Sequence, residues 1–530
     1  MTELSVATPS IAATLRHRAF RGLLAGGTLY FVGNAMQVMA TSWHMVELTG
    51  SSFLAALVQT AVFLPMFLFA LPAGVLADTT DRRRLMLAAL LVQAATVALL
   101  ALLLFVGWIS AGWLLFLTFV SGTCTALLSP SWNSAVVDTV PRDELPQAIT
   151  GIGISYNGAR ALGPALAGAM YVYVGEGWVF IAAVAGVLLM YRAIARHPPR
   201  PHPPSRLPAE RLWGGMLSAL RFARHSEAVL AQLVRTMAFG AAGSALWALL
   251  PVVGQRQLGL AATGFGLLMA CMGGGAVLAG LAIGRMRVRL GLERLVGLGT
   301  LLFAIAMLVA AWSTVRGVVY LALAVGGGAW MSVMSTYNTA TQTSAPRWVR
   351  ARANALHVLS GLGAFAIGSA LWGALSSGLG LSVTLSVAAG CLGAAMLLAR
   401  PFPLRMSELD EVTQATLSED LFVVHQPEPE AGPVAVEIGY RIRAADTTEF
   451  LDAISLLRGP RRRDGATFWR VYRDLNDPSR YVERFIITSW ADYLHQRARA
   501  TLADQELEAR VRTYLQSGES ATTQHYIAER

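Results

Sequence analysis

Polar side chains recur at helical spacing inside three long apolar stretches of this sequence. Steps of three and four residues place such side chains on one face of a helix. A polar face inside a bilayer should meet water or other protein. The three faces consist of Tyr30, Asn34, Gln37, Thr41 and His44, then Thr118, Ser121, Thr125, Ser129 and Asn133, then Ser335, Asn338 and Gln342. Together they predict a water-filled cavity, although hydrogen bonds between helices would explain any single residue.

Arg160 is a further candidate for binding chemistry. It falls near the middle of an apolar stretch, where an arginine costs at least about 2.5–3.5 kcal/mol on insertion scales. We expect it to contact an anion or substrate, or to join a gating network. The alternative is a side chain that extends to one membrane interface. The predicted substrate-cavity residues are Asn34, Gln37, Thr41, Asn133, Arg160, Asn338 and Gln342.

Few side chains could carry a proton. The middle of each predicted helix is without Asp or Glu, so the candidates for proton coupling reduce to His44, Glu47 and His357. Histidine titrates near neutral pH, but a lone buried histidine is more often structural.

The sequence lacks the residue patterns for ATP binding, disulfide formation and metal binding. The sequence contains no Gly-x-x-x-x-Gly-Lys-Ser/Thr motif and no lysine, so direct ATP drive is not expected. Cys124, Cys271 and Cys391 lie far apart in apolar stretches, which predicts neither a disulfide nor a metal site. We therefore expect no catalytic set, no metal and no cofactor.

The composition indicates a membrane protein. Hydrophobic residues make up 55% of the chain and charged residues 14%, against about 25% charged residues in soluble domains. Twelve stretches approach the ~20 residues that span a bilayer, and backbone groups in lipid must bond within their own segment, which predicts helices. These stretches are 20–44, 52–76, 84–106, 111–136, 146–172, 177–196, 227–253, 262–284, 292–312, 317–342, 352–375 and 381–399.

Arginines indicate the orientation. All 42 basic residues are arginine, and 27 of them precede residue 406. If the N-terminus is inside, 23 of these are cytoplasmic and only Arg256 and Arg316 fall outside, as the positive-inside rule requires. We expect both termini in the cytoplasm, a location in the cell (inner) membrane and an uncleaved first helix. Loops beside anionic lipid explain the basic charge, so nucleic-acid binding is not expected.

The sequence repeats at a fixed offset. The same shift takes Asn133 to Asn338 and Pro141 to Pro346, which predicts two similarly oriented halves. The proline-rich segment between the halves cannot continue a helix, and a short interfacial helix follows it. The predicted domains are 1–197, an N-terminal six-helix bundle; 198–225, a linker with an interfacial helix; 226–405, a C-terminal six-helix bundle; 406–432, an acidic linker; and 433–530, a cytoplasmic α+β domain.

The loop after the second predicted helix reads GVLADTTDRRR. With the repeat and the linker, it resembles the major facilitator superfamily, whose pattern there is Gly-x-Leu-Ala-Asp followed by basic residues. Asp81 stands where that pattern usually has glycine. The runs LRHRAFRGLLAG, TSWHMVELTGSS and SPSWNSAVVDTVPRDELPQAI resemble the enterobactin-exporter-like branch, or transmembrane secretion effector family. This resemblance covers essentially the whole chain.

The resemblance implies an all-α membrane protein with the superfamily fold of twelve transmembrane helices in two six-helix bundles. It implies a secondary active transporter rather than an enzyme, exporting a drug, siderophore or other natural product by alternating access with proton antiport. The gate that it implies consists of Gly74, Asp78, Arg82, Arg83 and Asp138. The antiporter-like packing motif that it implies consists of Gly158, Gly163, Pro164 and Gly168. Import on the same scaffold, or a membrane-anchored enzyme acting through the C-terminal domain, are the alternatives.

After residue 432 the pattern changes to short alternating and amphipathic segments. They predict a small α+β domain similar to the antibiotic-biosynthesis-monooxygenase-like ferredoxin fold, which often pairs as a dimer. Such a fold does not assign a chemistry, so we expect a regulatory, assembly or stability role, with self-association as one candidate. The predicted strands are 435–443, 467–475, 481–490 and 523–529, and the predicted helices are 448–457 and 503–516.

Overall fold

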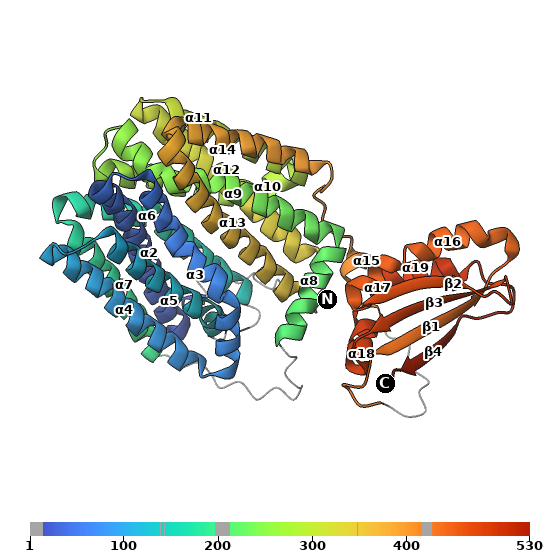
Figure 1. The fold of residues 1–530 in the computed structure, drawn as a ribbon. Helices are drawn as coiled ribbons and strands as arrows, with labels where there is room; N and C mark the ends of the chain where they lie inside the picture. Colours follow the sequence, from blue (N-terminus) through green and yellow to red (C-terminus); the bar gives the residue numbers. More distant parts are fainter. Residues whose placement is uncertain are drawn as a thin grey trace, which may run out of the picture. The chain divides into compact units, whose positions relative to one another are not determined.

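The computed structural model describes residues 14–137, 139–141, 144–196, 212–346, 348–415 and 427–529. The chain divides into two compact units (Figure 1). The first unit comprises Met1–Arg206, Arg235–Thr336 and Leu359–Arg400. The second unit comprises Leu207–Val234, Tyr337–Val358 and Pro401–Arg530.

Long helices build the first unit, and two sets follow each other along the chain. The first set is α2 (Arg18–Thr49), α3 (Ser52–Thr79), α4 (Arg82–Val106), α5 (Ala111–Val137), α6 (Leu145–Tyr173) and α7 (Glu176–Arg196). The second set is α9 (Glu227–Val252) with its π-helical continuation η1 (Val253–Gln257), α10 (Ala262–Leu290), α11 (Leu292–Trp312), α12 (Arg316–Thr343), α13 (Arg350–Leu379), and α14 (Leu381–Ala395) with the 3₁₀ turn η2 (Met396–Ala399). Each predicted apolar stretch corresponds to one of these helices.

Local sequence signals set several helix ends. Gly50 ends α2 with φ +61°, a left-handed conformation that glycine adopts without a Cβ clash. The Ser51 hydroxyl then caps α3 by accepting a hydrogen bond from the Leu54 amide at 3.3 Å. Asp81 caps α4 by accepting from the amides of Arg83 and Arg84 at 2.9 and 3.1 Å. The residue that departs from the superfamily loop pattern therefore starts a helix.

Glycines allow close contact within the first set. A Cβ at Gly186 of α7 would lie 2.6 Å from the Leu29 carbonyl oxygen of α2. A Cβ at Gly33 of α2 would lie 3.0 Å from the Ala183 Cα. The two helices therefore meet backbone to backbone, which small residues permit in membrane proteins.

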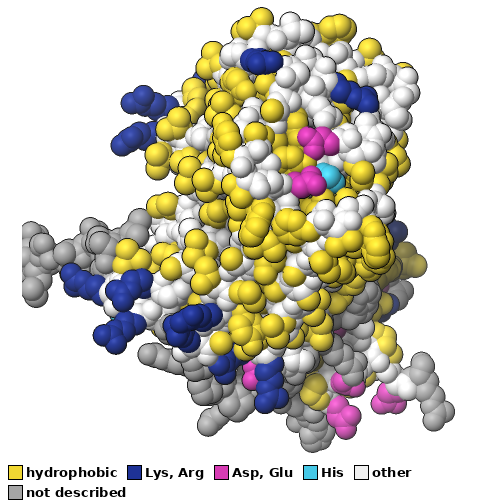
Figure 2. Space-filling model, turned by 90° about the vertical axis from the view of Figure 1, so that its left-hand side faces the viewer, with side chains coloured by type: hydrophobic (Ala, Val, Ile, Leu, Met, Phe, Trp, Pro, Cys, Tyr) yellow, Lys and Arg dark blue, Asp and Glu magenta, His cyan; other side chains and the backbone are white. Residues whose placement is uncertain are grey.

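The surface of the first unit suits a lipid environment. Eleven helices of the described chain are long and apolar enough to cross a membrane. Large apolar side chains such as Leu162, Leu281 and Leu102 are 63%, 75% and 56% exposed, and Figure 2 shows hydrophobic side chains spread over one face. α6 is not among the eleven. It carries Asn157 and Arg160, whose polarity lowers its mean hydropathy.

The second unit combines ends of helices with the C-terminal domain. It contains α8 (Leu212–His225) and the short α15 (Leu409–Val412), followed by a four-stranded sheet with helices. The strands pair antiparallel in the order β2-β3-β1-β4. The elements of this domain are β1 (Val434–Arg441), α16 (Thr447–Ser455), α17 (Arg458–Asp464), β2 (Phe468–Arg473), β3 (Arg480–Ile487), α18 (Trp490–Arg499), α19 (Leu502–Arg512) and β4 (Thr522–Ile527).

One fully buried carboxylate lies in the core of this domain. Glu483 accepts hydrogen bonds from the Tyr440 hydroxyl at 2.9 Å, Arg461 Nε at 3.1 Å and Trp469 Nε1 at 2.9 Å. Burying a charge is tolerable when it is paired and its hydrogen bonds are satisfied. Burial, and the negative charge of Glu483, raise the pKa of the Tyr440 phenol well above its usual value.

The same unit joins the C-terminal domain to α8 and to the segment before α13. Arg221 of α8 donates to the Gly465 carbonyl oxygen at 3.3 Å. The guanidinium of Arg499, a residue that is 7% exposed, lies 4.3 Å from the Trp348 ring centroid. Phe222 of α8 stacks edge-to-face on the same indole, with centroids 5.7 Å apart. Trp348 therefore contacts both α8 and the C-terminal domain.

Candidate functional site

The two helix sets contact each other near one end of the bundle. This end carries the turns that follow α2, α6 and α13, and we call it the Gly50 end. A Cβ at Gly273 of α10 would lie 2.6 Å from the Ala161 Cα of α6. A Cβ at Gly168 of α6 would collide with the Ala262 carbonyl oxygen. α6 and α10 therefore touch through their backbones.

A second contact joins α3 to α13. The Phe63 and Phe365 rings meet edge-to-face with centroids 4.8 Å apart. The Thr60 hydroxyl donates to the Ala366 carbonyl oxygen at 2.9 Å. A Cβ at Gly373 would collide with the side chain of Ala56. The two sets are thus packed on both sides of this end.

Trp43 of α2 lies between the sets. It is 2% exposed and stacks on Phe265 of α10, with centroids 5.3 Å apart and an interplanar angle of 23°. Its indole Nε1 donates to Glu47 at 2.6 Å. A side chain of the first set therefore forms part of the contact between the sets.

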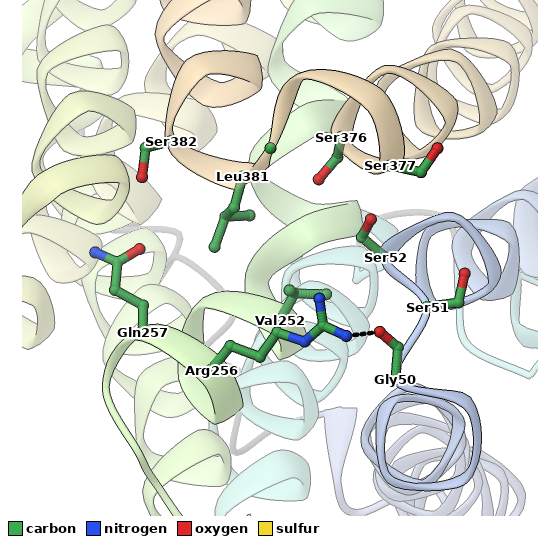
Figure 3. A pocket seen from close by; sticks show the side chains of 11 residues that line it. Gly50, Ser51, Ser52, Val252, Arg256, Gln257, Ser376, Ser377, Leu381 and Ser382 are labelled. Atoms are coloured by element: carbon green, nitrogen blue, oxygen red, sulfur yellow. Dashed lines mark hydrogen bonds between the residues drawn. The ribbon is translucent and has the colours of Figure 1, made fainter.

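A polar pocket of about 550 Å³ opens at the Gly50 end. Figure 3 shows Arg256 pointing toward Gly50, whose carbonyl oxygen accepts a hydrogen bond from its guanidinium. Five serines are among the lining residues: Ser51, Ser52, Ser376, Ser377 and Ser382. The hydrogen bond ties η1 to the turn after α2 and adds a polar contact between the two sets.

Two of the predicted proton-coupling residues meet beside Trp43. His44 Nδ1 lies 2.8 Å from Glu176 Oε2 and 3.9 Å from Glu47 Oε2. The Tyr171 hydroxyl hydrogen-bonds Glu47, Glu176 and His44. Figure 2 shows a face on which acidic side chains lie beside a histidine. The imidazole and the two carboxylates are the types of ligand that bind zinc, and their ligand atoms lie within 4.8 Å of one another.

Arg160 lies among aromatic rings from both sets. Its guanidinium carbon is 5.9 Å from the Tyr156 centroid and 5.2 Å from the Trp247 centroid. Phe31 packs edge-to-face on Tyr156, and Trp330 packs in the same way on Trp247. The arginine is exposed, and the Trp247 indole N–H has no hydrogen-bond partner among the described residues. This site offers a cation, an N–H donor and apolar rings, which suit an amphipathic anion.

The polar face of α2 is largely occupied by bonds inside the first set. Tyr30 donates to Gln93 at 3.2 Å, Gln93 donates to Ser121 at 3.3 Å, and Ser121 donates to Gln37 at 3.5 Å. Gln37 is 3% exposed. For these residues the hydrogen-bond alternative describes the structure better than a wet cavity does.

The other predicted cavity residues are more scattered. Asn34 is half-buried, and the buried Thr41 hydroxyl has no partner among the described residues. Asn133 lies in α5, but its side chain is outside the described part. In the second unit, Gln342 donates to Asn338 on the next turn of α12.

His357, the third proton-coupling candidate, is also in the second unit. It is 5% exposed and lies 3.4 Å from the Thr341 hydroxyl. It is therefore not part of the group formed by His44 and Glu47.

The residues of the predicted packing motif differ in how closely they contact other helices. A Cβ at Gly163 would lie 2.7 Å from the Ala35 Cβ of α2, whereas a Cβ at Gly158 would meet no atom within 4 Å. The Pro164 carbonyl oxygen faces Gly266 of α10. Close contact thus begins about one turn after Gly158.

The predicted gate falls partly outside the described residues. Gly74 and Asp78 lie in α3 with undescribed side chains, and Asp138 is wholly outside. Arg82 and Arg83 start α4, and Arg83 donates to the Ala195 carbonyl oxygen of α7 at 2.6 Å. The gate stays a prediction.

Sequence reasoning missed four residues that the structure places in these groups: Gln93, Tyr171, Glu176 and Trp247. Tyr171 and Glu176 flank the turn between α6 and α7, so the sequence alone could have predicted that they lie near each other. Their proximity to His44 was not, because it depends on how α2 packs on both helices.

The comparisons with known proteins agree with this architecture. Residues 9–530 match the transmembrane secretion effector family. The enterobactin exporter EntS of Salmonella typhi is 28% identical over 385 residues, which cover 68% of this chain and 86% of that protein. The macrolide efflux protein A of Streptococcus pyogenes is 28% identical over 126 residues. That match spans 24% of this chain and only 31% of the efflux protein.

Solved transporters share the fold at low sequence identity. The nucleoside transporter NupG aligns with a TM-score of 0.61 and 12% identity, covering 73% of this chain and all of that chain (100%). An inward-facing bacterial homologue of the lysosomal transporter Spinster aligns with a TM-score of 0.58 and 16% identity, covering 73% and 97%. The chain is a multi-pass membrane protein that belongs to the transmembrane secretion effector family of major facilitator superfamily transporters.

Proposed function

We propose that this protein exports a small amphipathic molecule, such as a drug, siderophore or other natural product, by alternating access. The observation that carries the proposal is the placement of Arg160 among aromatic rings of both helix sets. A cation costs free energy inside a membrane, and a ligand with a negative or hydrogen-bond-accepting group would offset that cost. The names of the relatives, an enterobactin exporter and a macrolide efflux protein, support export.

The contacts between the sets support an outward-closed state. At the Gly50 end, α6 meets α10, α3 meets α13, and Trp43 stacks on Phe265. The arginine distribution favours placing this end outside, with both termini in the cytoplasm of a bacterial inner membrane. α6 then serves as the twelfth span, because a helix of 29 residues is long enough to cross a bilayer.

Proton antiport is part of the proposal, with His44 and Glu47 as the coupling residues. The loop residues Asp78, Arg82 and Asp138 would latch the cytoplasmic side when the outer side opens. An ion pair that forms in one conformation and breaks in the other biases the two states by its differential interaction.

The C-terminal domain would act as a regulatory or assembly element with a ferredoxin-like fold. The strand order β2-β3-β1-β4 supports that fold. Its contacts with α8 and Trp348 support a mechanical role, because α8 directly precedes α9 in the chain and Trp348 directly precedes α13.

The direct test is a comparison of small molecules in the culture medium of three strains of the source organism: one without the protein, one with it restored, and one carrying Arg160→Ala. In the strain without the protein, we expect one or more compounds to be depleted from the medium and retained in the cells. The parent chain should restore their export, and the Arg160→Ala chain should not. Retention inside cells of the restored strain would instead favour import.

A further inference from the structure

Four hydrogen-bond contacts in the group beside Trp43 join four side chains from three helices. Tyr171 Oη contacts Glu47 Oε2, and it contacts Glu176 Oε2 at 2.9 Å. His44 Nδ1 contacts the same Glu176 oxygen at 2.8 Å and the Tyr171 hydroxyl at 3.1 Å. Each such contact needs a hydrogen atom between its two heavy atoms, and one hydrogen on Nδ1 can be shared between these two oxygens.

The ordinary protonation states supply too few hydrogens. The Tyr171 phenol carries one, and neutral His44 can place one on Nδ1. Two ionised carboxylates carry none. With only these two hydrogens for four contacts, the Tyr171 oxygen and one carboxylate oxygen would face each other as two acceptors. A third hydrogen on Glu176 or Glu47 satisfies that contact as well and removes the repulsion between two carboxylates.

His44 presents one of its two ring nitrogens to this group. The residue is 9% exposed, and its Nδ1 points into the group. Its Nε2 is buried with no partner among the described residues. A buried imidazole with only one nitrogen paired is incompletely satisfied.

A metal ion fits the group less well. Zinc binds nitrogen and oxygen ligands at about 2.0–2.2 Å in a tetrahedron, which holds the ligand atoms apart from one another. Here His44 Nδ1 and Glu176 Oε2 are 2.8 Å apart, and the Tyr171 hydroxyl lies between the two carboxylates. These distances suit shared hydrogens.

The surrounding elements contain few other charges. On α2 the group is faced by His44 and Glu47, on α6 by Tyr171, and on α7 by Glu176. η1 contributes Arg256, which bonds the Gly50 carbonyl oxygen rather than a carboxylate. α10 contributes Phe265, an uncharged ring.

We propose that His44, Glu47, Tyr171 and Glu176 form a proton-binding site that holds the Gly50-end gate closed, with Trp43 as the connecting side chain. Glu47 accepts the Trp43 indole N–H at 2.6 Å, and Trp43 stacks on Phe265 of the opposite set. Loss of the third proton leaves two carboxylates competing for one phenol hydrogen. Glu47 then moves, and the indole loses its anchor. The inference rests on the proposed alternating access but needs no transported substrate.

Proton binding should favour the closed state of the gate. The closed gate binds one more proton than the open gate, so its population rises as the pH falls. For one proton, the closed-to-open ratio changes by up to about tenfold per pH unit. Acid on the outer side therefore closes the gate, which would reset an exporter after it has released its cargo.

The test uses the full chain in lipid nanodiscs, with Cys124, Cys271 and Cys391 replaced by alanine. Spin labels at Val174→Cys and Val315→Cys report the distance across the Gly50 end, because these exposed residues lie on opposite sets. We expect the closed population to fall as pH rises from about 5 to about 8. Glu176→Gln and Tyr171→Phe should each flatten this dependence, and Tyr173→Phe, an 82% exposed neighbour, should retain it.

Glu47→Gln provides a second carboxamide variant if Glu176→Gln does not fold. The proposal would be overturned if the label distances in the parent chain did not change with pH. It would also be overturned if Glu176→Gln and Glu47→Gln both kept the pH dependence of the parent chain. A closed population that depends on added zinc and does not change with pH would also overturn the proposal, and it would assign a metal site instead. Because the distances are measured without substrate, failure of the export assay would leave this outcome unaffected.

Discussion

At the residue scale, the proposed substrate site centres on Arg160. Cation–π contacts contribute about 0.5–2 kcal/mol, so Arg160→Ala should weaken binding of an anionic substrate about two- to thirtyfold. Lysine lacks the planar guanidinium that stacks on Tyr156 and Trp247, so Arg160→Lys should restore only part of the loss. Leu162→Ala, on the exposed side of the same helix, is the control. Titration of substrate against indole fluorescence measures the effect, and equal affinity in all variants would remove Arg160 from the site.

Asp78 provides a separate test of the predicted cytoplasmic latch. Asp78→Asn should slow transport and shift the balance of inward- and outward-open states, because the proposed latch loses its acidic group. The cost is about 3–5 kcal/mol for a well-buried pair and much less for a wet one. Asp81→Asn keeps a good helix cap and should behave as the parent chain. Parent-like rates and state populations in Asp78→Asn would reduce Asp78 to a charge that orients the loop.

His525 makes the C-terminal domain sensitive to acid. Burial, and the nearby positive charge of Arg497, lower the pKa of its imidazole, whose Nε2 lies 2.6 Å from the Tyr493 hydroxyl. The unfolded chain then binds the proton more tightly, so the domain loses stability as pH falls below about 6.5. The protection of β4 amides in the full chain, measured relative to their intrinsic exchange rate at each pH, should therefore fall on acidification. His525→Gln should reduce the effect, and the exposed His495→Gln should not.

At the element scale, the contact between α6 and α10 should control which side of the protein is open. Gly168→Leu places a side chain where the Ala262 backbone lies, and overpacking costs about 1–3 kcal/mol. The outward-closed state should lose population by roughly five- to 150-fold. Gly158→Leu, where a Cβ meets no atom within 4 Å, is the control. The same label pair across the Gly50 end measures both, and equal closure in the two variants would contradict the assigned contact.

Arg499 should hold the C-terminal domain to the segment before α13. Arg499→Ala removes the contact with the Trp348 ring and the hydrogen bond to the Asp464 carbonyl oxygen at 3.3 Å. Amides of α8 and of residues 348–353 should then exchange faster with deuterium. Arg510→Ala, on the exposed side of α19, should leave them protected. Unchanged exchange in Arg499→Ala would show that Trp348 does not depend on the domain.

How far the sequence predicts each element depends on the strength of its local signal. Long apolar runs are strong signals, and the stretch predicted at 84–106 is α4, Arg82–Val106. α17 and α18 were not predicted, because α17 begins Arg-Gly-Pro and α18 is rich in polar residues. Burial of Trp490 and Tyr493 stabilises α18, and that packing is not visible in the local pattern. Arg160 could be found from its depth, but Trp247 could not, because only the packing of the two sets brings it near.

At the scale of the whole molecule, the helices of the first unit combine a closed end with a charged residue, Arg160, next to the contact that closes it. Backbone-to-backbone contacts of α6 with α10, and side-chain contacts of α3 with α13, close the Gly50 end. Arg160 directly precedes Ala161, where the α6–α10 contact begins. Alternating access requires that opening this end exposes the same arginine to the opposite side of the membrane.

Accessibility of position 160 tests that requirement most directly. In an Arg160→Cys chain without its three native cysteines, a membrane-impermeant maleimide is applied to right-side-out and everted vesicles. We predict rapid labelling in everted vesicles and slow labelling in right-side-out vesicles, because the outer end is closed. Addition of Gly168→Leu should reverse the preference. Rapid labelling from the outside without Gly168→Leu, or equal labelling from both sides with it, would contradict the account.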